Sequence, residues 1–388
     1  MLRALWFHIM VLGGFSVSAG EDDMATTPVQ STTLPVIDVT GTHAQIGQAI
    51  GETLRDGLRD VAESHRAGVA RTVGWERAME IAAQLIPYAE RSVSDCVAEL
   101  RGVASGSGVP FKTLFSMNAL QETRFLAGRD GASLGPAYDD ECTSLAASCA
   151  ATRDGSVLLA HNEDAGSIRR ALPYVVRARP TGRPAFLGFA YSGLLLYQGM
   201  NDRGIGSVGN ALYARDVRPG VPKLFAYRDI LDATFLEDAI RRTRKPDRAN
   251  GNNHLLANEH GEIYDVEVSG GDSALHYASM SMFAHTNHIV DDRLRTVEWG
   301  DLLNSELRLH RVQRLMAQRH GSLDVDTLFA ILSDHSNFPK SVCKHADPFH
   351  NPDVETVASV VIDLTAGAIH VRPGHPCETV TTTVTLAA

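Results

Sequence analysis

The chain has 388 residues, of which 44% are hydrophobic and 21% charged, and its formal net charge is −10. This length is ample for a full core in one large domain or two. The negative charge argues against nucleic acid or an anionic membrane as a partner, because both require basic patches. No apolar run reaches the length that crosses a bilayer.

Residues 1–33 are interpreted as a possible signal peptide and linker. Arg3, the apolar stretch Ala4 to Phe15 and the small residues up to Ala19 resemble a secretory signal that is cut after Ala19. Met24 offers an alternative start. The protein is secreted or periplasmic if the signal is real, and cytoplasmic otherwise.

Residues 34–141 are predicted to form a mainly helical segment. A short strand is predicted over 35–39. Apolar residues then recur at helical spacing, first over 46–61 and again over 75–100, and Pro110 is well placed to begin another helix. A loop rich in small and acidic residues is expected over 131–140.

Residues 142–388 are dominated by strand patterns. A tight hairpin is predicted from Thr143 to Ala160, with its turn at Asp154-Gly155. Further hairpins are expected around 259–261 and 366–367, and helical periods occur at 224–242 and 302–318. This order of elements predicts an α+β fold with antiparallel sheets.

Cys142 begins the first strand after the helical segment and is the candidate nucleophile. A thiol reacts as the thiolate, and a free cysteine with a pKa near ~8.5 needs a base. The α-amine of an N-terminal residue, with a pKa of about 7.7–8.0, can serve as that base. This amine exists only after the bond between Glu141 and Cys142 is cut. The same thiol can make the cut by attacking the Glu141 carbonyl, which gives a thioester that water resolves.

The predicted hairpin returns two polar residues to the neighbourhood of Cys142. Asp164 is expected to hold the new ammonium by a charge-assisted hydrogen bond, and Asn162 to orient the same group. Strict pairing about the Asp154-Gly155 turn places Asp164 opposite Leu145, so the end of the hairpin must bend for this contact to form.

Other kinds of site are less well supported. Residues 204–209 match G-x-G-x-x-G, but the parallel βαβ context of a dinucleotide site is missing. Six metal-capable residues offer partial ligand sets whose spacing matches no common zinc motif: His285, His288, Asp334, His335, Cys343 and His345. We therefore expect no metal and no cofactor, and a zinc hydrolase is the less favoured alternative.

The stretch Cys142-Thr143-Ser144, followed by 158–164, resembles the peptidase C45 family. This family comprises acyl-CoA:6-aminopenicillanic acid acyltransferases and relatives such as the β-alanyl-amine hydrolases. Further blocks agree in order along the chain: 41–51, 117–122, 199–206, 253–257 with Glu267, 285–288 and 334–345. Each block alone is weak, but the ordered series is specific.

The resemblance implies a four-layer αββα N-terminal-nucleophile hydrolase fold with antiparallel sheets. It implies a zymogen that cuts itself between Glu141 and Cys142, and two fragments that stay associated. The roles that it carries over are Cys142 as nucleophile, Asp164 as the group that orients its amine, Asn253 as oxyanion donor, Ser305 and Arg308 near the pocket, and His288 and His345 as supports that hydrogen-bond from behind it.

We therefore expect a thiol amidohydrolase or acyltransferase that acts on a small-molecule amide or thioester, such as a small N-acyl amine, through an acyl-enzyme on Cys142. Glu141 departs from the family pattern, since relatives often have glycine before the cysteine. That departure supports the alternative of a non-processing binding protein on the same scaffold.

Overall fold

The computed structural model describes residues 34–129, 140–166, 172–196, 198–278, 280–347, 349 and 354–387. Contacts divide the chain into two compact units, Met1–Thr33 and Leu34–Ala388, and all the described residues belong to the second. The expected leader and nearly all of the expected acidic loop lie outside the described residues. Among the described helices, none combines the length and the apolar character needed to cross a bilayer.

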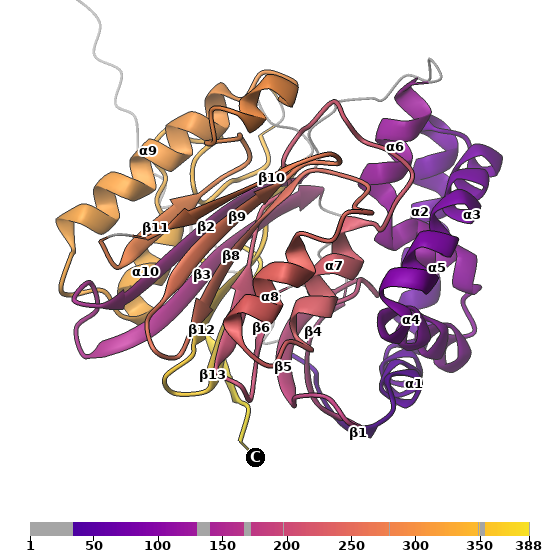
Figure 1. Cartoon of the computed structure of the whole chain (residues 1–388), viewed down its shortest axis with the longest axis horizontal. Helices are drawn as coiled ribbons and strands as arrows, with labels where there is room; N and C mark the ends of the chain where they lie inside the picture. Colours follow the sequence, from indigo (N-terminus) through magenta and orange to yellow (C-terminus); the bar gives the residue numbers. More distant parts are fainter. Residues whose placement is uncertain are drawn as a thin grey trace, which may run out of the picture. The chain divides into compact units, whose positions relative to one another are not determined.

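Two β-sheets occupy the middle of the Leu34–Ala388 unit (Figure 1). In spatial order, the described strands of the first sheet are β1 (Val36–Gly41), β4 (Pro173–Pro180), β5 (Phe186–Tyr191), β6 (Gln198–Asn201), β7 (Ile205–Val208), β8 (Asn252–Asn258), β9 (Ile263–Val268) and β10 (Ser273–Tyr277). Those of the second sheet are β11 (Met282–His285), β2 (Asp140–Cys149), β3 (Gly155–Gly166), β12 (Val354–Asp363), β13 (Ala368–Pro373) and β14 (Thr382–Thr385). Strands β1 and β4 are parallel, and both sheets are otherwise antiparallel over the described pairs.

Helices cover the outer face of each sheet (Figure 1). On the side of the first sheet lie α1 (His43–Thr53), α2 (Arg55–Thr72), α3 (Trp75–Ser92), α4 (Ser94–Ser107), α5 (Phe111–Asn118), α6 (Leu120–Arg129), α7 (Lys223–Ile230) and α8 (Leu236–Thr243). On the second sheet lie α9 (Leu303–Gln318) and α10 (Val325–Leu332), and the short helix η2 (Leu294–Val297) precedes α9. The predicted α+β class and αββα layering are confirmed. Strand β1 shows that the helical first segment also contributes to a sheet.

Helices α1 and α4 pack at very short range because glycines line their contact. A Cβ at Gly47 would come within 1.8 Å of the Glu99 carbonyl oxygen, and one at Gly102 within 2.1 Å of the Ala44 carbonyl oxygen. The side chains of Thr42 and Gln45 form a capping box that begins α1. These glycines are therefore required by close backbone approach, not by a turn.

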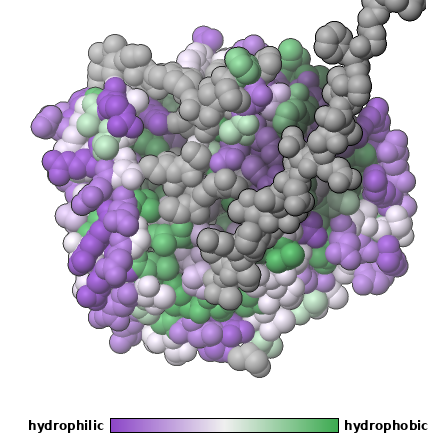
Figure 2. Space-filling view, turned by 180° about the vertical axis from the view of Figure 1, so that it is seen from behind, coloured by the Kyte–Doolittle hydropathy of each residue, from purple (hydrophilic) through white to green (hydrophobic). Residues whose placement is uncertain are grey.

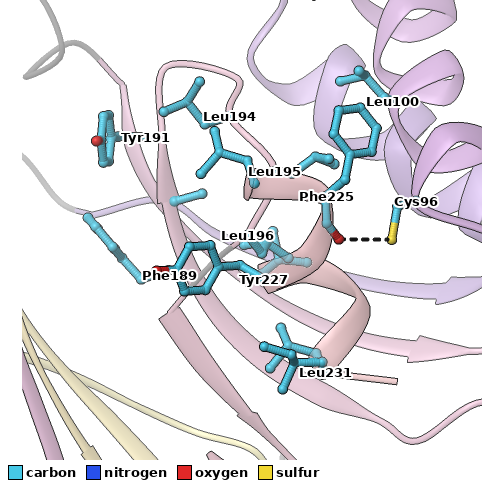
Figure 3. Close-up of a cluster of buried hydrophobic side chains, with 14 of the residues drawn as sticks. Cys96, Leu100, Phe189, Tyr191, Leu194, Leu195, Leu196, Phe225, Tyr227 and Leu231 are labelled. Carbon is cyan, nitrogen blue, oxygen red and sulfur yellow. Dashed lines mark hydrogen bonds between the residues drawn. The ribbon is translucent and has the colours of Figure 1, made fainter. Parts of the chain in front are cut away.

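The main core lies between the two sheets and between the first sheet and its helices. Figure 3 shows part of it, where Phe225 of α7 faces Cys96 of α4 and the Cys96 thiol donates to the Phe225 carbonyl at 3.8 Å. Burial raises the pKa of Cys96 well above its ordinary value, so this thiol is an inert core residue. Tyr191 and Tyr227 belong to the same cluster, and both also line the cavity beside Cys142.

The exposed face seen in Figure 2 is mostly hydrophilic at its periphery, and hydrophobic groups show toward the middle. Exposed charged residues are frequent in the helices, and exposed ion pairs such as Arg77–Glu80 and Arg241–Glu237 follow helical spacing. Such pairs contribute little to the free energy of unfolding. The stability of the fold therefore depends on the apolar layers between the helices and the sheets.

Candidate functional site

The hairpin β2–β3 sets the position of the candidate nucleophile, and its turn differs from the prediction. Strand β2 ends at Cys149 and β3 begins at Gly155, with a register shift between Ala147 and Cys149. The prediction of a two-residue turn at Asp154-Gly155 was therefore wrong, because five residues connect the two strands. Cys149, at the end of β2, adopts a positive φ of 50°. Consequently Asp164 lies opposite Glu141, not opposite Leu145.

Cys142 lies opposite Glu163, so their side chains share one face of the second sheet. This face is the inner one, since Ala146 on the same face packs into the core between the sheets. Side chains alternate along a strand, so Glu141 and Asp164 point to the other face, toward α9 and α10. The thiol and the predicted ammonium-binding carboxylate are thus on opposite faces.

The thiol of Cys142 lies in a buried polar network, and the residue is only 3% exposed. Its Sγ donates to Glu163 Oε2 at 3.6 Å, and the Tyr191 hydroxyl donates to Glu163 Oε1 at 2.5 Å. His161 Nε2 lies 3.2 Å from Glu163 Oε2, and His161 Nδ1 lies 2.9 Å from Ser144 Oγ. Glu163 is therefore the carboxyl group that contacts the sulfur of the candidate nucleophile.

The backbone of Cys142 is held by two buried side chains from other elements. Its amide N–H donates to Asn287 Oδ1 at 2.8 Å, and its carbonyl accepts from Arg308 Nη1 at 2.5 Å. Arg308 Nη2 also donates to Asn287 Oδ1 at 2.8 Å. Asn287 follows edge strand β11, and Ser305 Oγ, one turn before Arg308 on α9, accepts from the Asn287 amide at 2.7 Å. The structure thus brings Arg308 to Cys142 and places Ser305 behind Asn287.

A cluster of charged side chains surrounds Glu141 on the opposite face of the second sheet. Lys344 Nζ donates to Glu141 Oε2 and lies 3.9 Å from Asp164 Oδ2, while Arg308 Nη2 lies 3.3 Å from Glu141 Oε2. Burial acts to raise the pKa of Glu141, but Lys344 and Arg308 hold it below its ordinary value. Burial raises the pKa of Asp164 to about 7 against those two cations, and Asp164 Oδ1 accepts from Thr356 Oγ1 at 2.6 Å.

Asn162 does not reach Cys142. Its Nδ2 donates to the carbonyls of Leu332 and Val342 at 2.8 and 2.9 Å, and its Oδ1 accepts from Ser359 Oγ at 2.5 Å. The hydrogen bonds of the Asn162 side-chain amide therefore join β3 to β12, to the end of α10 and to the segment after it. The expectation that Asn162 orients the ammonium is therefore not met in the intact chain.

Asn253 is buried on β8 but its side chain is engaged away from the thiol. Its Nδ2 donates to Asp265 Oδ1, and its Oδ1 accepts from the backbone N–H of Asn210 at 2.7 Å. Asn210 itself is fully buried, and neither polar atom of its side chain has a hydrogen-bond partner among the described residues. It stands between Gly209 and Ala211, which line the same cavity as Cys142. Asn253 thus holds Asn210 in place.

The two histidines predicted to support the pocket, His288 and His345, lie in different clusters. His288 Nδ1 lies 2.9 Å from Ser305 Oγ, behind Asn287, and burial lowers the pKa of His288 to about 4. His345 Nε2 instead lies 3.5 Å from the Sγ atoms of both Cys343 and Cys377. His345 therefore belongs to a different cluster, outside the Cys142 site.

Residues 151–377, more than half of the chain, match the sequence model of a family described as acyl-coenzyme A:6-aminopenicillanic acid acyl-transferase. The chain belongs to this acyltransferase family. The resemblance to peptidase C45 proteins is thereby confirmed, and the protein is a hydrolase or acyltransferase that acts on C–N amide bonds. No curated protein sequence matches the chain.

Solved structures give further matches to this member of the acyltransferase family. Penicillin V acylase from Agrobacterium tumefaciens matches with a TM-score of 0.45 and 15% identity, over 63% of this chain and 86% of that chain. A variant of conjugated bile acid hydrolase from Clostridium perfringens matches with a TM-score of 0.45 and 13% identity, over 63% of this chain and 97% of that chain.

A small cavity adjoins the thiol in this family member. Its volume is about 30 Å³, which is room for one or two water molecules. Its lining combines apolar and polar residues from α5, α6, α7, both sheets and the segments that follow β5 and β7: Met117, Asn118, Leu120, Gln121, Glu122, Cys142, Glu163, Tyr191, Leu194, Gly209, Ala211, Lys223, Leu224 and Tyr227. The intact chain therefore has a small cavity beside the Cys142 thiol, the candidate nucleophile.

Two polar residues of this lining have unsatisfied atoms. Both polar atoms of the Gln121 side chain, and Oε2 of Glu122, lack a hydrogen-bond partner among the described residues. Glu122 Oε1 accepts from the Lys223 amide at 2.9 Å, and burial raises the pKa of Glu122. Buried polar atoms are costly without partners, so these side chains are suited to bind a ligand that enters the cavity.

Sequence reasoning assigned no role to four residues of the candidate site: Glu163, Asn287, Tyr191 and Lys344. The period of two along a hairpin could have found Glu163, because odd-numbered residues of β3 share a face with even-numbered residues of β2. Asn287 and Lys344 lie within the family blocks 285–288 and 334–345, which indicate no individual role for either residue. Tyr191 carries no local signal, since the first sheet brings it to Glu163.

Proposed function

We propose that this protein is a self-processing thiol amidohydrolase or acyltransferase, which acts on a small N-acyl amine or acyl thioester through an acyl-enzyme on Cys142. The single observation that carries this proposal is the way Cys142 is held. Its thiol, its amide and its carbonyl each contact a different buried side chain, namely Glu163, Asn287 and Arg308. A structural cysteine has no need of such an arrangement.

Self-processing begins with transfer of the thiol proton to Glu163 Oε2, which already accepts a hydrogen bond from Sγ. The sulfur attacks the carbonyl carbon of Glu141, and the C–N bond to Cys142 breaks as the new amine takes a proton. Water hydrolyses the thioester left on sulfur. This step returns the thiol of Cys142 and gives Glu141 a new C-terminal α-carboxylate. The cavity beside Sγ has room for that water.

The contacts of Glu141 favour processing over the binding-protein alternative. A charged side chain before the cysteine is costly to bury unless it is paired. Lys344 and Arg308 both contact the Glu141 carboxylate, and both are almost fully buried. The departure from glycine is therefore compensated by two cations, and the segment before Cys142 is held in place for the cut.

In the mature enzyme the free α-amine of Cys142 acts as the base. Asn287 Oδ1 already accepts from the corresponding nitrogen, so it orients the amine as soon as it forms. Asp164 supplies negative charge from the other face of the sheet once Glu141 has gone. We assign the oxyanion donor to the side-chain amide of Asn210, which has no hydrogen-bond partner among the described residues and whose backbone N–H is held by Asn253. One such donor contributes about 2.7–4 kcal/mol in other enzymes.

The lining supports a substrate with one apolar and one polar part. Met117, Leu194 and Leu224 offer apolar contact, whereas Gln121 and Glu122 offer unsatisfied polar atoms. A buried carboxyl group pairs best with an amine or an amide donor. We therefore infer a small acyl amine whose polar group is bound by Gln121 and Glu122.

The test is the intact mass of the purified protein, followed by N-terminal sequencing and an assay against a panel of N-acyl amines and thioesters. We expect two fragments, one of which begins at Cys142, and activity only in cut material. Cys142→Ala should give one uncut, inactive chain. Cys149→Ser is the matched control, because it removes an exposed thiol outside the site and should leave cutting and activity unchanged. Active material with no chain that begins at Cys142 would refute the proposal.

A further inference from the structure

Four potential metal ligands meet in the structure on the side of the second sheet that carries α9 and α10. His335 follows α10, Cys343 and His345 lie in the segment between α10 and β12, and Cys377 follows β13. Their Nε2 and Sγ atoms all lie within 4.8 Å of one another. None of the four contacts Cys142 or Glu163 in the hydrogen bonds of the described residues, and the proposed reaction does not use them.

The separations between these ligand atoms form a regular pattern. The two Sγ atoms are 3.6 Å apart, and His345 Nε2 is 3.5 Å from each of them. His335 Nε2 is 3.1 Å from His345 Nε2. These two ring nitrogens are close enough to share one hydrogen bond, or to bind one cation together with the two sulfur atoms.

These separations agree with tetrahedral coordination of one zinc ion. Zn–S bonds of about 2.3 Å and Zn–N bonds of about 2.0–2.1 Å place ligand atoms roughly 3.8 Å apart for S–S, roughly 3.6 Å for S–N and roughly 3.3 Å for N–N. The S–S separation, the two from His345 Nε2 to the sulfurs and the N–N separation are each within about 0.2 Å of these values, and the two from His335 Nε2 to the sulfurs lie within 4.8 Å. A Cys₂His₂ donor set with this geometry is typical of structural zinc.

A disulfide does not account for the cluster. The sulfur atoms of Cys343 and Cys377 are 3.6 Å apart and both cysteines are free thiols, whereas a disulfide needs about 2.05 Å. A disulfide would also leave the two imidazoles without a reason to converge on the sulfur pair. The metal explains all four residues together.

The surroundings of the cluster also fit a metal site. His345 presents Nε2 to the sulfurs, while its Nδ1 faces the Glu378 carboxylate at 4.0 Å. Carboxylates behind ligating histidines fix the ring orientation and raise the basicity of the ligand. The backbone preorders the segment, since the Cys343 amide donates to the Asp334 carbonyl at 3.0 Å and the His345 amide to the Pro339 carbonyl at 3.3 Å.

We propose that His335, Cys343, His345 and Cys377 bind one structural Zn²⁺, with both cysteines as thiolates whose protons are released on binding. Four protein ligands leave no open position, so this ion holds the fold and does not activate water. The site was disfavoured from sequence because Cys377 lies 32 residues beyond His345 and only the β12–β13 hairpin returns it.

The ion fixes the residue that neutralises Glu141. Lys344 lies between two of the ligands, its amide donates to Thr356 Oγ1 at 2.8 Å, and its carbonyl accepts from the Thr356 amide at 2.9 Å. Metal binding at Cys343 and His345 thus clamps Lys344 against β12, with Nζ directed to Glu141. In this respect the role of the ion in processing rests on the proposed function, whereas metal binding itself does not.

The test is the metal content of full-length, untagged protein that is expressed with added zinc and dialysed against a weak chelator. We expect one zinc per chain, both in wild type and in Cys142→Ala, so the result is independent of self-cutting. Cys343→Ser combined with Cys377→Ser should lose the metal, and His335→Gln, at an exposed ligand, should bind it at least tenfold more weakly. Cys149→Ser removes a thiol elsewhere and should keep one zinc per chain.

Cobalt provides a readout that does not depend on the folding of a variant. Wild type reconstituted with Co²⁺ should show thiolate-to-cobalt charge-transfer bands and the intense visible bands of tetrahedral cobalt. Wild-type zinc content no higher than that of the double cysteine variant, an octahedral cobalt spectrum, or a mass that shows a Cys343–Cys377 disulfide in freshly purified protein would each overturn the proposal.

Discussion

Glu141 and Asp164 face one another across β2 and β3, on the side of the second sheet opposite to the Cys142 thiol. Lys344 bonds to the first carboxylate and lies 3.9 Å from the second. The residue before the proposed cleavage site and the residue expected to hold the new ammonium are therefore coupled through one cation before any bond is cut. This coupling makes the charge of Asp164 a measurable property of the intact chain.

The first prediction concerns pH and stability. In Cys142→Ala, which should stay uncut, we expect the contribution of Asp164 to the free energy of unfolding to fall as the pH rises from about 4 to about 7. Burial raises the pKa of Asp164 from 3.8 to about 7 in the folded chain, so the folded state binds this proton more tightly than the unfolded state. The stability that this group contributes is present in full below pH 3.8 and is lost as the pH rises through 7, by at most about 1.4 kcal/mol per pH unit.

Urea unfolding at a series of pH values measures this slope, and Asp164→Asn in the same background provides the comparison. Asp265, whose pKa burial raises to about 6, titrates in the same direction in both proteins, so the difference between them isolates Asp164. Between about pH 4 and about pH 7, the free energy of unfolding of Cys142→Ala should fall relative to that of the variant that also carries Asp164→Asn. Parallel profiles for the two proteins would mean that Asp164 is ionised in the intact chain.

The second prediction concerns Arg308. We expect Arg308→Gln to slow self-cutting by at least about tenfold, because hydrogen bonds to charged groups contribute about 1.5–3 kcal/mol each and this guanidinium donates to Cys142, Thr143 and Asn287. Arg308→Lys should be nearly as slow, since an ammonium cannot reproduce the fork geometry. The appearance of fragments over time on denaturing gels gives the rate. Arg314→Gln, on an exposed part of the same helix, should match wild type.

The third prediction concerns Asn287. Asn287→Ala removes the acceptor of the Cys142 N–H, and we expect the first-order rate of cutting and the kcat of residual mature enzyme both to fall by about 10–100-fold. Asn287→Asp keeps an acceptor for Cys142 and for Arg308 but loses the Nδ2 donor to the Ala211 carbonyl, so it should retain more activity than the alanine variant. Equal losses in the two variants would show that the acceptor is not the important atom.

The fourth prediction separates Asn253 from Asn210. We expect Asn253→Ala to lower kcat far more than it raises KM, because it releases the backbone of Asn210. Asn210→Ala should lower kcat by about 10²–10³-fold if its amide is the oxyanion donor. The double variant should then be little worse than Asn210→Ala alone, since both changes act on one group. Additive losses would assign a separate role to Asn253.

Much of the architecture could be predicted from the sequence. Helical periods before Cys142, strand runs after it and the ordered family blocks predict the αββα layers, and the structure confirms them. The pairing register of β2 and β3 could not be predicted, because it depends on the positive φ of Cys149 and on a connection of five residues. A local turn motif at Asp154-Gly155 was the stronger signal and gave the wrong partner for Asp164.

The site residues also divide into those that have a local sequence signal and those that only the folded chain brings together. Cys142 and Arg308 were found from local pattern or family position, and the structure places them in contact. Asn162 was misplaced because alternation directs it toward α10, where backbone carbonyls use its amide. Lys344 and Cys377 could not be found locally, since a long segment and a β-hairpin bring them to their partners.

Cys142 is anchored by Asn287 and Arg308, neither of which belongs to the segment that precedes it. Severing the bond before Cys142 would therefore leave the new terminus in place while Glu141 departs from Lys344 and Arg308. The carboxylate of Glu141 is one of the charges that keep Asp164 protonated, and its two former partners favour ionised Asp164. Maturation would thus pass two counterions from a discarded acid to a retained one, and the only change that it requires in the sheet is the loss of Asp140 and Glu141 from the end of β2.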